Sequence, residues 1–407
     1  MGRAYKCIII GDNALTIECA KILIASNFSI TLFSTLNSEV TAWAHQNSIT
    51  LLNDLHKLEY SQIDCDFIFS IANTRILSQT LLALAKYLAI NYHNAPLPKY
   101  AGAYANAWAI LNNENLHGVT WHVMTEKIDG GDILEQSFFP IEETDTAFTL
   151  NIKCFEHALK SFQILVSNLN RNTFTPIPQN PQNRSYYTLA KKPKNNGIID
   201  FNDDAISIHR MIRALNFGHL PNEFCHCKIV LKNQFYFPKE AVVLNIQSVA
   251  SPGTVIAYDN FSLQITTKTH DIRITRLCNQ YDCIQNIFLL FKKLGIKINN
   301  SLLTCSNHKT LENLKYKTND LDQAKQGFYT DKKIHKLIQN QAKKIPNKIA
   351  IIDEYAQITY QELEVKSNQL AQLLVQSGIH GDTMIGIYLD RNSNIIVSVL
   401  AVLKCHS

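Results

Sequence analysis

Three side chains in the first half of the chain could carry chemistry together. Asn91 and His93 stand two residues apart at the end of an apolar run, and Asp129 lies in the segment 128–131 (IDGG). An amide, an imidazole and a carboxylate can donate hydrogen bonds to developing negative charge and can move protons. A histidine at a strand end is more often structural, so these residue types alone leave both interpretations open.

The elements that would position Asn91 and His93 follow an alternating pattern. Apolar strand-like runs alternate with segments of helical spacing: strands at 6–11, 28–33, 66–71 and 89–93, and helices at 14–25 and 77–88. Such alternation predicts an open, Rossmann-like α/β domain with a parallel sheet. Because strand side chains alternate, Asn91 and His93 should share one face at the carboxyl end of their strand, where open α/β sheets bind ligands.

The rest of the chain changes character several times. A stretch rich in Asn, Pro and Gln is followed by short strand-like runs that predict a small, OB-like β-barrel, and a polar stretch precedes a new strand and helix pattern. The predicted organisation is a catalytic domain at 1–166, a linker at 167–186, a barrel subdomain at 187–298, a second linker at 299–330 and a C-terminal α/β part at 331–407.

The composition is that of an ordinary globular protein. Of 407 residues, 46% are hydrophobic and 18% charged, and the formal net charge is only +5, which does not indicate a nucleic-acid binder. No apolar stretch is long enough to span a membrane, and the N-terminus does not resemble a signal peptide. Ten scattered cysteines favour reduced thiols, so we expect a cytoplasmic protein.

Two local patterns could indicate a metal or a dinucleotide. The run 225–227 (CHC) has no second ligand pair at zinc spacing, so no metal is expected. Gly11 follows the first predicted strand but lacks the other glycines of G-x-G-x-x-G, which favours a tight turn over NAD binding.

The order of the segments around the three residues closely resembles the folate-dependent formyltransferase family. The pattern N-x-H-x-x-x-L-P, then a G-V-T strand, then D-G-G-D-I-L, is carried by 90–102 (INYHNAPLPKYAG), 117–124 (HGVTWHVM) and 128–134 (IDGGDIL). The segments 108–112 (WAILN) and 208–221 (IHRMIRALNFGHLP) also match. The resemblance is closest to formyltransferase domains that open some nonribosomal peptide synthetases. Methionyl-tRNA enzymes carry His-Pro-Ser-Leu-Leu-Pro where 93–98 reads HNAPLP, which leaves the acceptor open.

The resemblance implies a reaction and its residues. An amine would attack the formyl carbon of 10-formyltetrahydrofolate, with no metal or second cofactor. Asn91 and a protonated His93 would stabilise the oxyanion, while Asp129 would raise the pKa of His93 and help to move protons. The family's folate-binding positions correspond here to Ile71, Ala72, Asn73, Ile76, Leu77, Pro96, Leu97, Pro98, Lys127, Ile128 and Gly130.

Residues 332–404 resemble the beginning of an adenylation domain of a nonribosomal peptide synthetase. The segment 358–363 (ITYQEL) is similar to that family's L-T-Y-x-E-L motif, and 398–404 (SVLAVLK) to the helix before its next motif. The family's phosphate-binding loop, ribose-binding aspartate and catalytic lysine have no counterpart here, so we expect a truncated fragment that does not activate amino acids. Its apolar residues Leu363, Leu370 and Leu374 should be loosely packed or dock onto the barrel.

The two resemblances together imply the acceptor. A formyltransferase joined to an adenylation domain would formylate the amino group of an aminoacyl thioester on the phosphopantetheine of a peptidyl carrier protein, with the rest of a synthetase as its partner. Methionyl-tRNA is less favoured, because residues 22–56 contain no Lys or Arg and phosphate contacts dominate tRNA affinity. A small-molecule or sugar amine, hydrolysis of the folate, and a non-catalytic docking remnant of a synthetase remain alternatives.

Overall fold

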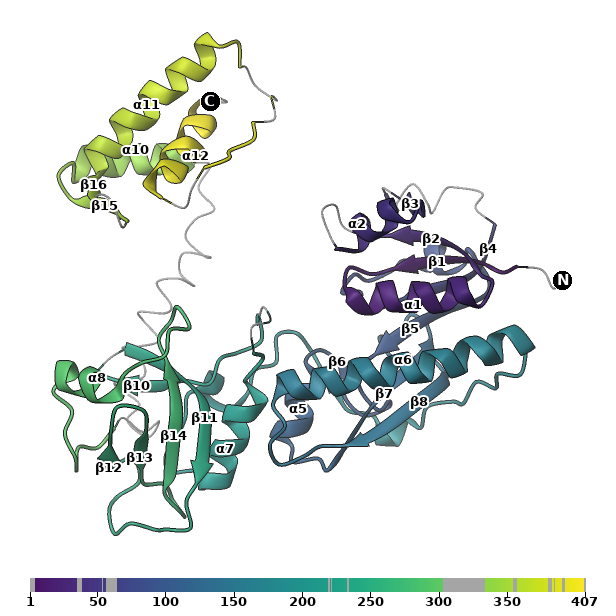
Figure 1. Cartoon of the computed structure of the whole chain (residues 1–407), viewed down its shortest axis with the longest axis horizontal. Helices are drawn as coiled ribbons and strands as arrows, with labels where there is room; N and C mark the ends of the chain where they lie inside the picture. Colours follow the sequence, from purple (N-terminus) through teal and green to yellow (C-terminus); the bar gives the residue numbers. More distant parts are fainter. Residues whose placement is uncertain are drawn as a thin grey trace. The chain divides into compact units, whose positions relative to one another are not determined.

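The chain divides into two compact units, residues 1–311 and residues 312–407 (Figure 1). The computed structural model describes residues 4–34, 39–52, 54–55, 64–218, 220, 222–232, 234–302, 334–353, 357–379, 383, 385–389 and 392–405.

A seven-stranded sheet organises the first part of the larger unit. Its strands are β1 (Lys6–Ile10), β2 (Ser29–Phe33), β3 (Thr50–Leu52), β4 (Cys65–Ser70), β5 (Ala85–His93), β7 (Leu116–Val123) and β8 (Ile133–Pro140). The spatial order is β3-β2-β1-β4-β5-β7-β8. The first five strands are parallel, whereas β7 is antiparallel to both β5 and β8. The α/β prediction is confirmed, but the sheet is mixed because β7 runs opposite to both of its neighbours.

Helices account for the remaining differences from the expected elements. They are α1 (Ala14–Ala25), α2 (Glu39–Gln46), α4 (Gln79–Leu82), α5 (Ala105–Leu111) and α6 (Ala147–Arg171). The helix expected at 77–88 is wrong for most of its length, because Ala85 already pairs with Cys65 as the start of β5. Helix α6 continues to Arg171, so residues 167–171 of the expected linker are helical.

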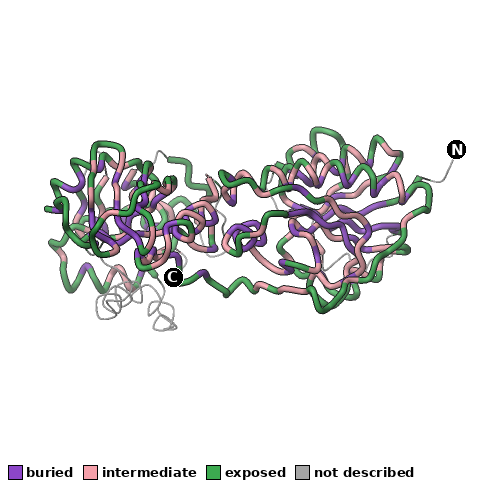
Figure 2. The backbone as a smooth tube through the Cα atoms, turned by 90° about the horizontal axis from the view of Figure 1, so that it is seen from below, coloured by how far each residue is buried: buried purple, intermediate pink, exposed green. Residues whose placement is uncertain are grey.

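Both faces of the sheet are covered, which explains why its central strands are apolar runs. Ile9 and Phe69 pack with α1 and α6 on one face, whereas Ile8 and Ile68 belong to a cluster on the other. Trp121 of β7 is fully buried, with its ring centroid 4.5 Å from that of Phe162 of α6. Figure 2 shows buried backbone through the centre of this sheet.

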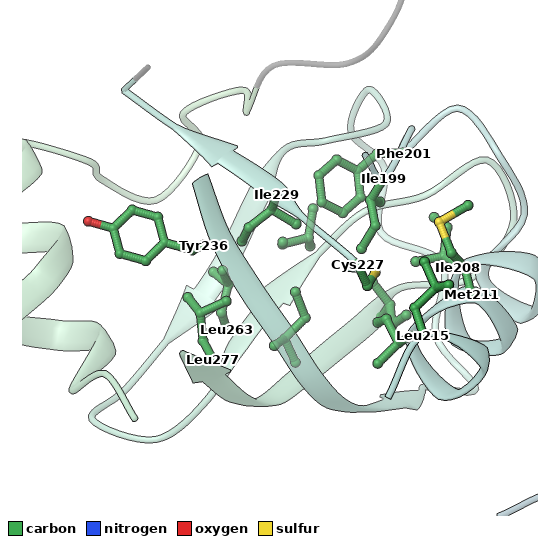
Figure 3. Close-up of a cluster of buried hydrophobic side chains, with 14 of the residues drawn as sticks. Ile199, Phe201, Ile208, Met211, Leu215, Cys227, Ile229, Tyr236, Leu263 and Leu277 are labelled. Atoms are coloured by element: carbon green, nitrogen blue, oxygen red, sulfur yellow. The ribbon is translucent and has the colours of Figure 1, made fainter. Parts of the chain in front are cut away.

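The second part of the larger unit is a five-stranded antiparallel sheet. Its elements are α7 (Ala205–Ala214), β10 (Ile229–Leu231), β11 (Gln234–Val243), β12 (Val255–Tyr258), β13 (Leu263–Ile265), β14 (Ile272–Cys278) and α8 (Ile287–Leu294). The strand order is β10-β11-β14-β13-β12, an antiparallel half-barrel that agrees with the expected small barrel subdomain. The buried residues Ile208 and Met211 of α7 share a core with Ile229 and Leu263 of the sheet (Figure 3).

The smaller unit has a core of its own. It contains α10 (Ile334–Lys344), β15 (Ile349–Ile352), β16 (Gln357–Thr359), α11 (Tyr360–Gln376) and α12 (Ser393–Cys405). Leu363 is only 3% exposed and packs with Ile358, Val397 and Leu400, with Leu370 partly buried beside them. The expectation that Leu363 is loosely packed is therefore wrong, because α12 covers that face of α11. The apolar residues of 384–389 (MIGIYL) favour a strand, but residues 385–389 are irregular and Met384 lies outside the described residues.

No helix in the described parts of the chain is both long and apolar enough to cross a membrane. The nine cysteines in these parts are all free thiols.

Replacing Phe162 by Ala should lower the free energy of unfolding of the larger unit by about 3–5 kcal/mol, because the ring fills the space between α6 and the sheet. Urea unfolding followed by tryptophan fluorescence would measure this, since Trp43, Trp108 and Trp121 all lie within residues 1–311. Ile164→Ala on the same helix is the control, because Ile164 is 51% exposed. Equal destabilisation by both variants would contradict the packing described.

Candidate active site

The structure brings Asn91, His93 and Asp129 together at the carboxyl end of β5. Asn91 pairs in register with Ser70 of β4 and, on the other side, with His122 of β7. The Nδ1 atom of His93 lies 3.6 Å from Oδ2 of Asp129, and both side chains are largely buried. Asn91 and His93 lie on β5, whereas Asp129 lies in the loop between β7 and β8. The pairing of β7 with β5 brings this loop to the end of β5.

His93 is held in one tautomer by a backbone carbonyl. Its Nε2 lies 2.8 Å from the carbonyl oxygen of Tyr100, which can only accept, so Nε2 carries the hydrogen. Burial lowers the pKa of His93 below its ordinary value, although Asp129 and the Tyr100 carbonyl oppose this. Burial thus opposes the imidazolium in the free protein, whereas the expectation of a protonated His93 during the reaction stays a prediction. Protonation at Nδ1 would direct the second ring N–H of His93 toward Asp129.

Asp129 is ionised and tightly held. Burial alone would raise its pKa, but His93, His122 and the amide of Gly102 lower it to about 2. The Gly102 amide donates to Oδ2 at 2.8 Å. Asp129 adopts a left-handed φ of 49°, which Asp tolerates better than most residues. The loop then passes close to the backbone of Val123. This approach requires Gly131, because a Cβ there would collide with the Val123 carbonyl oxygen.

His122 belongs to the site although the sequence did not single it out. Its Nδ1 donates to the Val123 carbonyl at 2.9 Å, so in the neutral ring Nε2 can accept from the Asn91 amide, 3.2 Å away. The same Nε2 lies 3.5 Å from Oδ1 of Asp129. His122 therefore links Asn91 to Asp129. It leaves a second amide hydrogen of Asn91 without an acceptor among the residues that the structure describes.

The turn expected to bind folate follows β4 at the topological switch point of the sheet. Strand β1 lies between β2 and β4, and the connections run in opposite directions on its two sides, which is where such sheets bind ligands. Arg75 lies in the turn after β4, and its Nη1 atom is 3.2 Å from Oδ2 of Asp12, which follows β1. Asn73 fixes the turn by accepting from the Arg75 amide at 3.0 Å.

The other expected folate positions divide by burial. Ile71, Leu77 and Leu97 are buried. The Ile71 amide donates to the Ile10 carbonyl of β1, and the Ile71 carbonyl accepts from the Thr16 hydroxyl of α1. The remainder are at least partly accessible: Ala72, Ile76, Pro96, Pro98, Lys127, Ile128 and Gly130. Ile76 stands out, with 88% of its surface exposed beside the turn. Direct contacts of these residues with folate stay predictions.

The run 225–227 and the Gly11 turn are the two other patterns that the sequence offered. No group of three or more His, Cys, Asp or Glu side chains among the described residues could hold a metal ion. Cys225 instead donates to the Asn196 carbonyl at 2.9 Å, and Cys227 is buried. Gly11 makes a close turn against Thr16 and the Ile71 carbonyl, where a Cβ would collide.

Three family models match the chain. Residues 33–165 match "Formyl transferase", residues 191–283 match "Formyl transferase, C-terminal domain", and residues 338–406 match "AMP-binding enzyme". The first range contains Asn91, His93, His122 and Asp129. The second covers α7 and all five strands of the half-barrel.

Relatives and solved structures agree with these matches. The bifunctional polymyxin resistance protein ArnA of Wigglesworthia glossinidia brevipalpis is 30% identical over 274 residues, covering 65% of this chain but only 39% of ArnA. Methionyl-tRNA formyltransferase of Clostridium acetobutylicum is 28% identical, over 59% of this chain and 77% of that enzyme. WlaRD, a sugar 3N-formyl transferase solved in the presence of dTDP and 5-N-formyl-THF, shares the fold with a TM-score of 0.54 and 23% identity, covering 67% of this chain and 98% of WlaRD.

A histidine-ring NMR titration should show His93 losing its proton below the ordinary value of 6.5. Asp129→Asn should lower this pKa further, because Asp129 is the anion that favours the imidazolium. Glu126→Gln, which neutralises an exposed carboxylate nearby in the chain, is the control and should leave His93 unchanged. Titration of His93 above 6.5, or a higher pKa in Asp129→Asn, would contradict the assignment.

Proposed function

Residues 33–165 and 191–283 belong to the formyl transferase family, and from that premise we propose that the chain is an enzyme that transfers a formyl group from 10-formyltetrahydrofolate to an amine. The observation that carries the proposal is the buried cluster of Asn91, His93 and Asp129 at the carboxyl end of β5, inside the matched range. A donor at the switch point beside this strand end would bring its formyl carbon to the cluster.

The proposed chemistry follows from the hydrogen positions. The amine nitrogen attacks the formyl carbon and forms the new C–N bond, and the carbonyl electron pair moves onto oxygen. The second amide hydrogen of Asn91 donates to that oxyanion. His93 takes the proton of the attacking amine at Nδ1, directly or through a water molecule, and Asp129 beside it stabilises the imidazolium. The carbonyl re-forms, the bond to folate N10 breaks, and His93 returns its proton to that nitrogen.

We propose that the acceptor amine is the amino group of an aminoacyl thioester on a peptidyl carrier protein. Support comes from the match of residues 338–406 to AMP-binding enzymes on the same chain, because adenylation domains of peptide synthetases load such carriers. The absence of Lys and Arg between residues 22 and 56 weighs against tRNA. The nine free thiols suit a cytoplasmic reaction.

Asn91→Ala should lower the single-turnover rate of formyl transfer about 10²–10³-fold, the usual cost of removing one oxyanion donor. Rapid-quench assays with formyl-labelled donor would measure the rate. Asn170→Ala, at an exposed position of α6, is the matched control. A wild-type rate in Asn91→Ala would exclude Asn91 from the reaction.

The acceptor can be tested by direct comparison. The full chain is incubated with 10-formyltetrahydrofolate and, in separate tubes, valyl-phosphopantetheinyl carrier protein, initiator methionyl-tRNA or an amino sugar nucleotide, with His93→Ala as the control. Formylation of the carrier-bound valine, lost in His93→Ala, is the expected result. Preferential formylation of another acceptor would replace the proposed substrate. Formate release alone would indicate a hydrolase, and absence of donor binding would overturn the proposed function.

A further inference from the structure

We propose that residues 177–187, between the two matched formyltransferase domains, act as a clasp that positions the catalytic Asp129 and His93. Gln179 and Arg184 are its positioning residues. This inference rests on the proposed formyl transfer, because it assigns the segment a role in that reaction beyond joining two domains.

The clasp binds the backbone of the Asp129 loop. The Gln179 side chain donates to the carbonyl oxygens of Asp129 at 2.9 Å and Gly131 at 2.7 Å. Arg184 donates to the carbonyls of Asp129 at 3.1 Å and Ile128 at 2.7 Å. A loop with a left-handed residue cannot pair these carbonyls in a regular ladder, so side-chain donors must satisfy them. The four hydrogen bonds fix the direction in which the Asp129 carboxylate points.

An antiparallel bridge anchors the start of the clasp. The amide of Ile177 donates to the Ile133 carbonyl and the amide of Ile133 donates back, each at 2.8 Å. Ile133 is the first residue of β8, directly after the loop that carries Asp129. The clasp is therefore attached to the sheet where the catalytic loop ends.

The end of the clasp holds a short strand and the residue before it, which together contact both catalytic side chains. This strand, β6 (Ala101–Gly102), pairs with β9 (Tyr186–Tyr187) of the clasp. Ser185 accepts from the Tyr100 amide at 2.7 Å through its hydroxyl and from the Ala101 amide at 3.0 Å through its carbonyl. The Tyr100 carbonyl in turn binds His93, and the Gly102 amide binds Asp129.

The approach of the two strands requires the glycine in β6. Gly102 has a left-handed φ of 97°, and a Cβ at this position would collide with the carbonyl oxygen of Tyr187. The backbones of the clasp and of β6 therefore approach each other so closely that only a glycine fits at position 102.

Arg184 also contributes charge to the site. The charged and titratable groups that act on His93 are Asp129, His122, His117 and Arg184. Among them, the Arg184 guanidinium disfavours the imidazolium and so lowers the pKa of His93. This effect is smaller than those of burial, Asp129 and the Tyr100 carbonyl, so the clasp acts first through its hydrogen bonds and only second through its charge.

Two variants of the full chain separate positioning from stability. Gln179→Ala should lower kcat by up to about 10²-fold with a smaller change in the KM for the folate donor, because a displaced Asp129 misorients the reacting groups. Arg184→Gln should lower kcat and also shift the acidic limb of the kcat–pH profile upward, because a cation near His93 is removed. The melting temperature of each variant is recorded as the measure of a structural role.

Matched controls come from the same region. Gln182→Ala changes an exposed glutamine within the clasp, and Arg171→Gln removes an exposed cation at the end of α6; both should behave as wild type. The proposal is overturned if kcat in Gln179→Ala and Arg184→Gln equals that of the controls, or if their loss follows a lower melting temperature with the pH profile unmoved.

The clasp can also be tested without turnover. In a histidine-ring NMR titration, Arg184→Gln should raise the pKa of His93, whereas Arg171→Gln should not. If the wild-type chain transfers no formyl group, the proposed function is refuted. The titration would still test whether Arg184 of the clasp acts on His93, because it needs no turnover. An unmoved His93 in that titration would refute the positioning role by itself.

Discussion

The burial of one carboxylate, that of Asp129, constrains the rest of the site. A buried charge is costly unless hydrogen bonds and opposite charges compensate it, and Asp129 has the Gly102 amide and two histidine rings around it. Supplying these partners requires a left-handed residue, a glycine loop and a strand brought close from residues 101–102. The mixed sheet and the interdomain segment 177–187 form the scaffold that meets this requirement.

The same burial sets the protonation states on which the proposed chemistry depends. Burial disfavours the His93 imidazolium and lowers the pKa of His93, whereas Asp129 remains ionised with a pKa of about 2. A neutral imidazole beside a fixed anion can accept a proton during the reaction, because the imidazolium finds its counterion already in place. Asn91, oriented through His122, completes the arrangement with a donor for the developing oxyanion.

Local pattern predicted part of this structure from the sequence. Alternation placed Asn91 and His93 on one strand end, and the helix at 14–25 formed as expected because Asn13 caps it. His122 was missed because it faces Asn91 only when β7 runs antiparallel to β5, and the strand pattern does not encode direction. Gln179 and Arg184 were missed because their partners are backbone carbonyls of a distant loop, which leave no periodicity in the sequence.

The most direct test of the account is the pH dependence of single-turnover formyl transfer from 10-formyltetrahydrofolate, measured from about pH 5 to about pH 8. A His93→Gln variant serves as the reference, because its residual rate reports only the titration of the acceptor amine. The account predicts that the wild-type advantage over this variant falls on acidification, with a midpoint below 6.5, as His93 loses its ability to accept a proton. An advantage that grows on acidification, or no advantage at any pH, would contradict it.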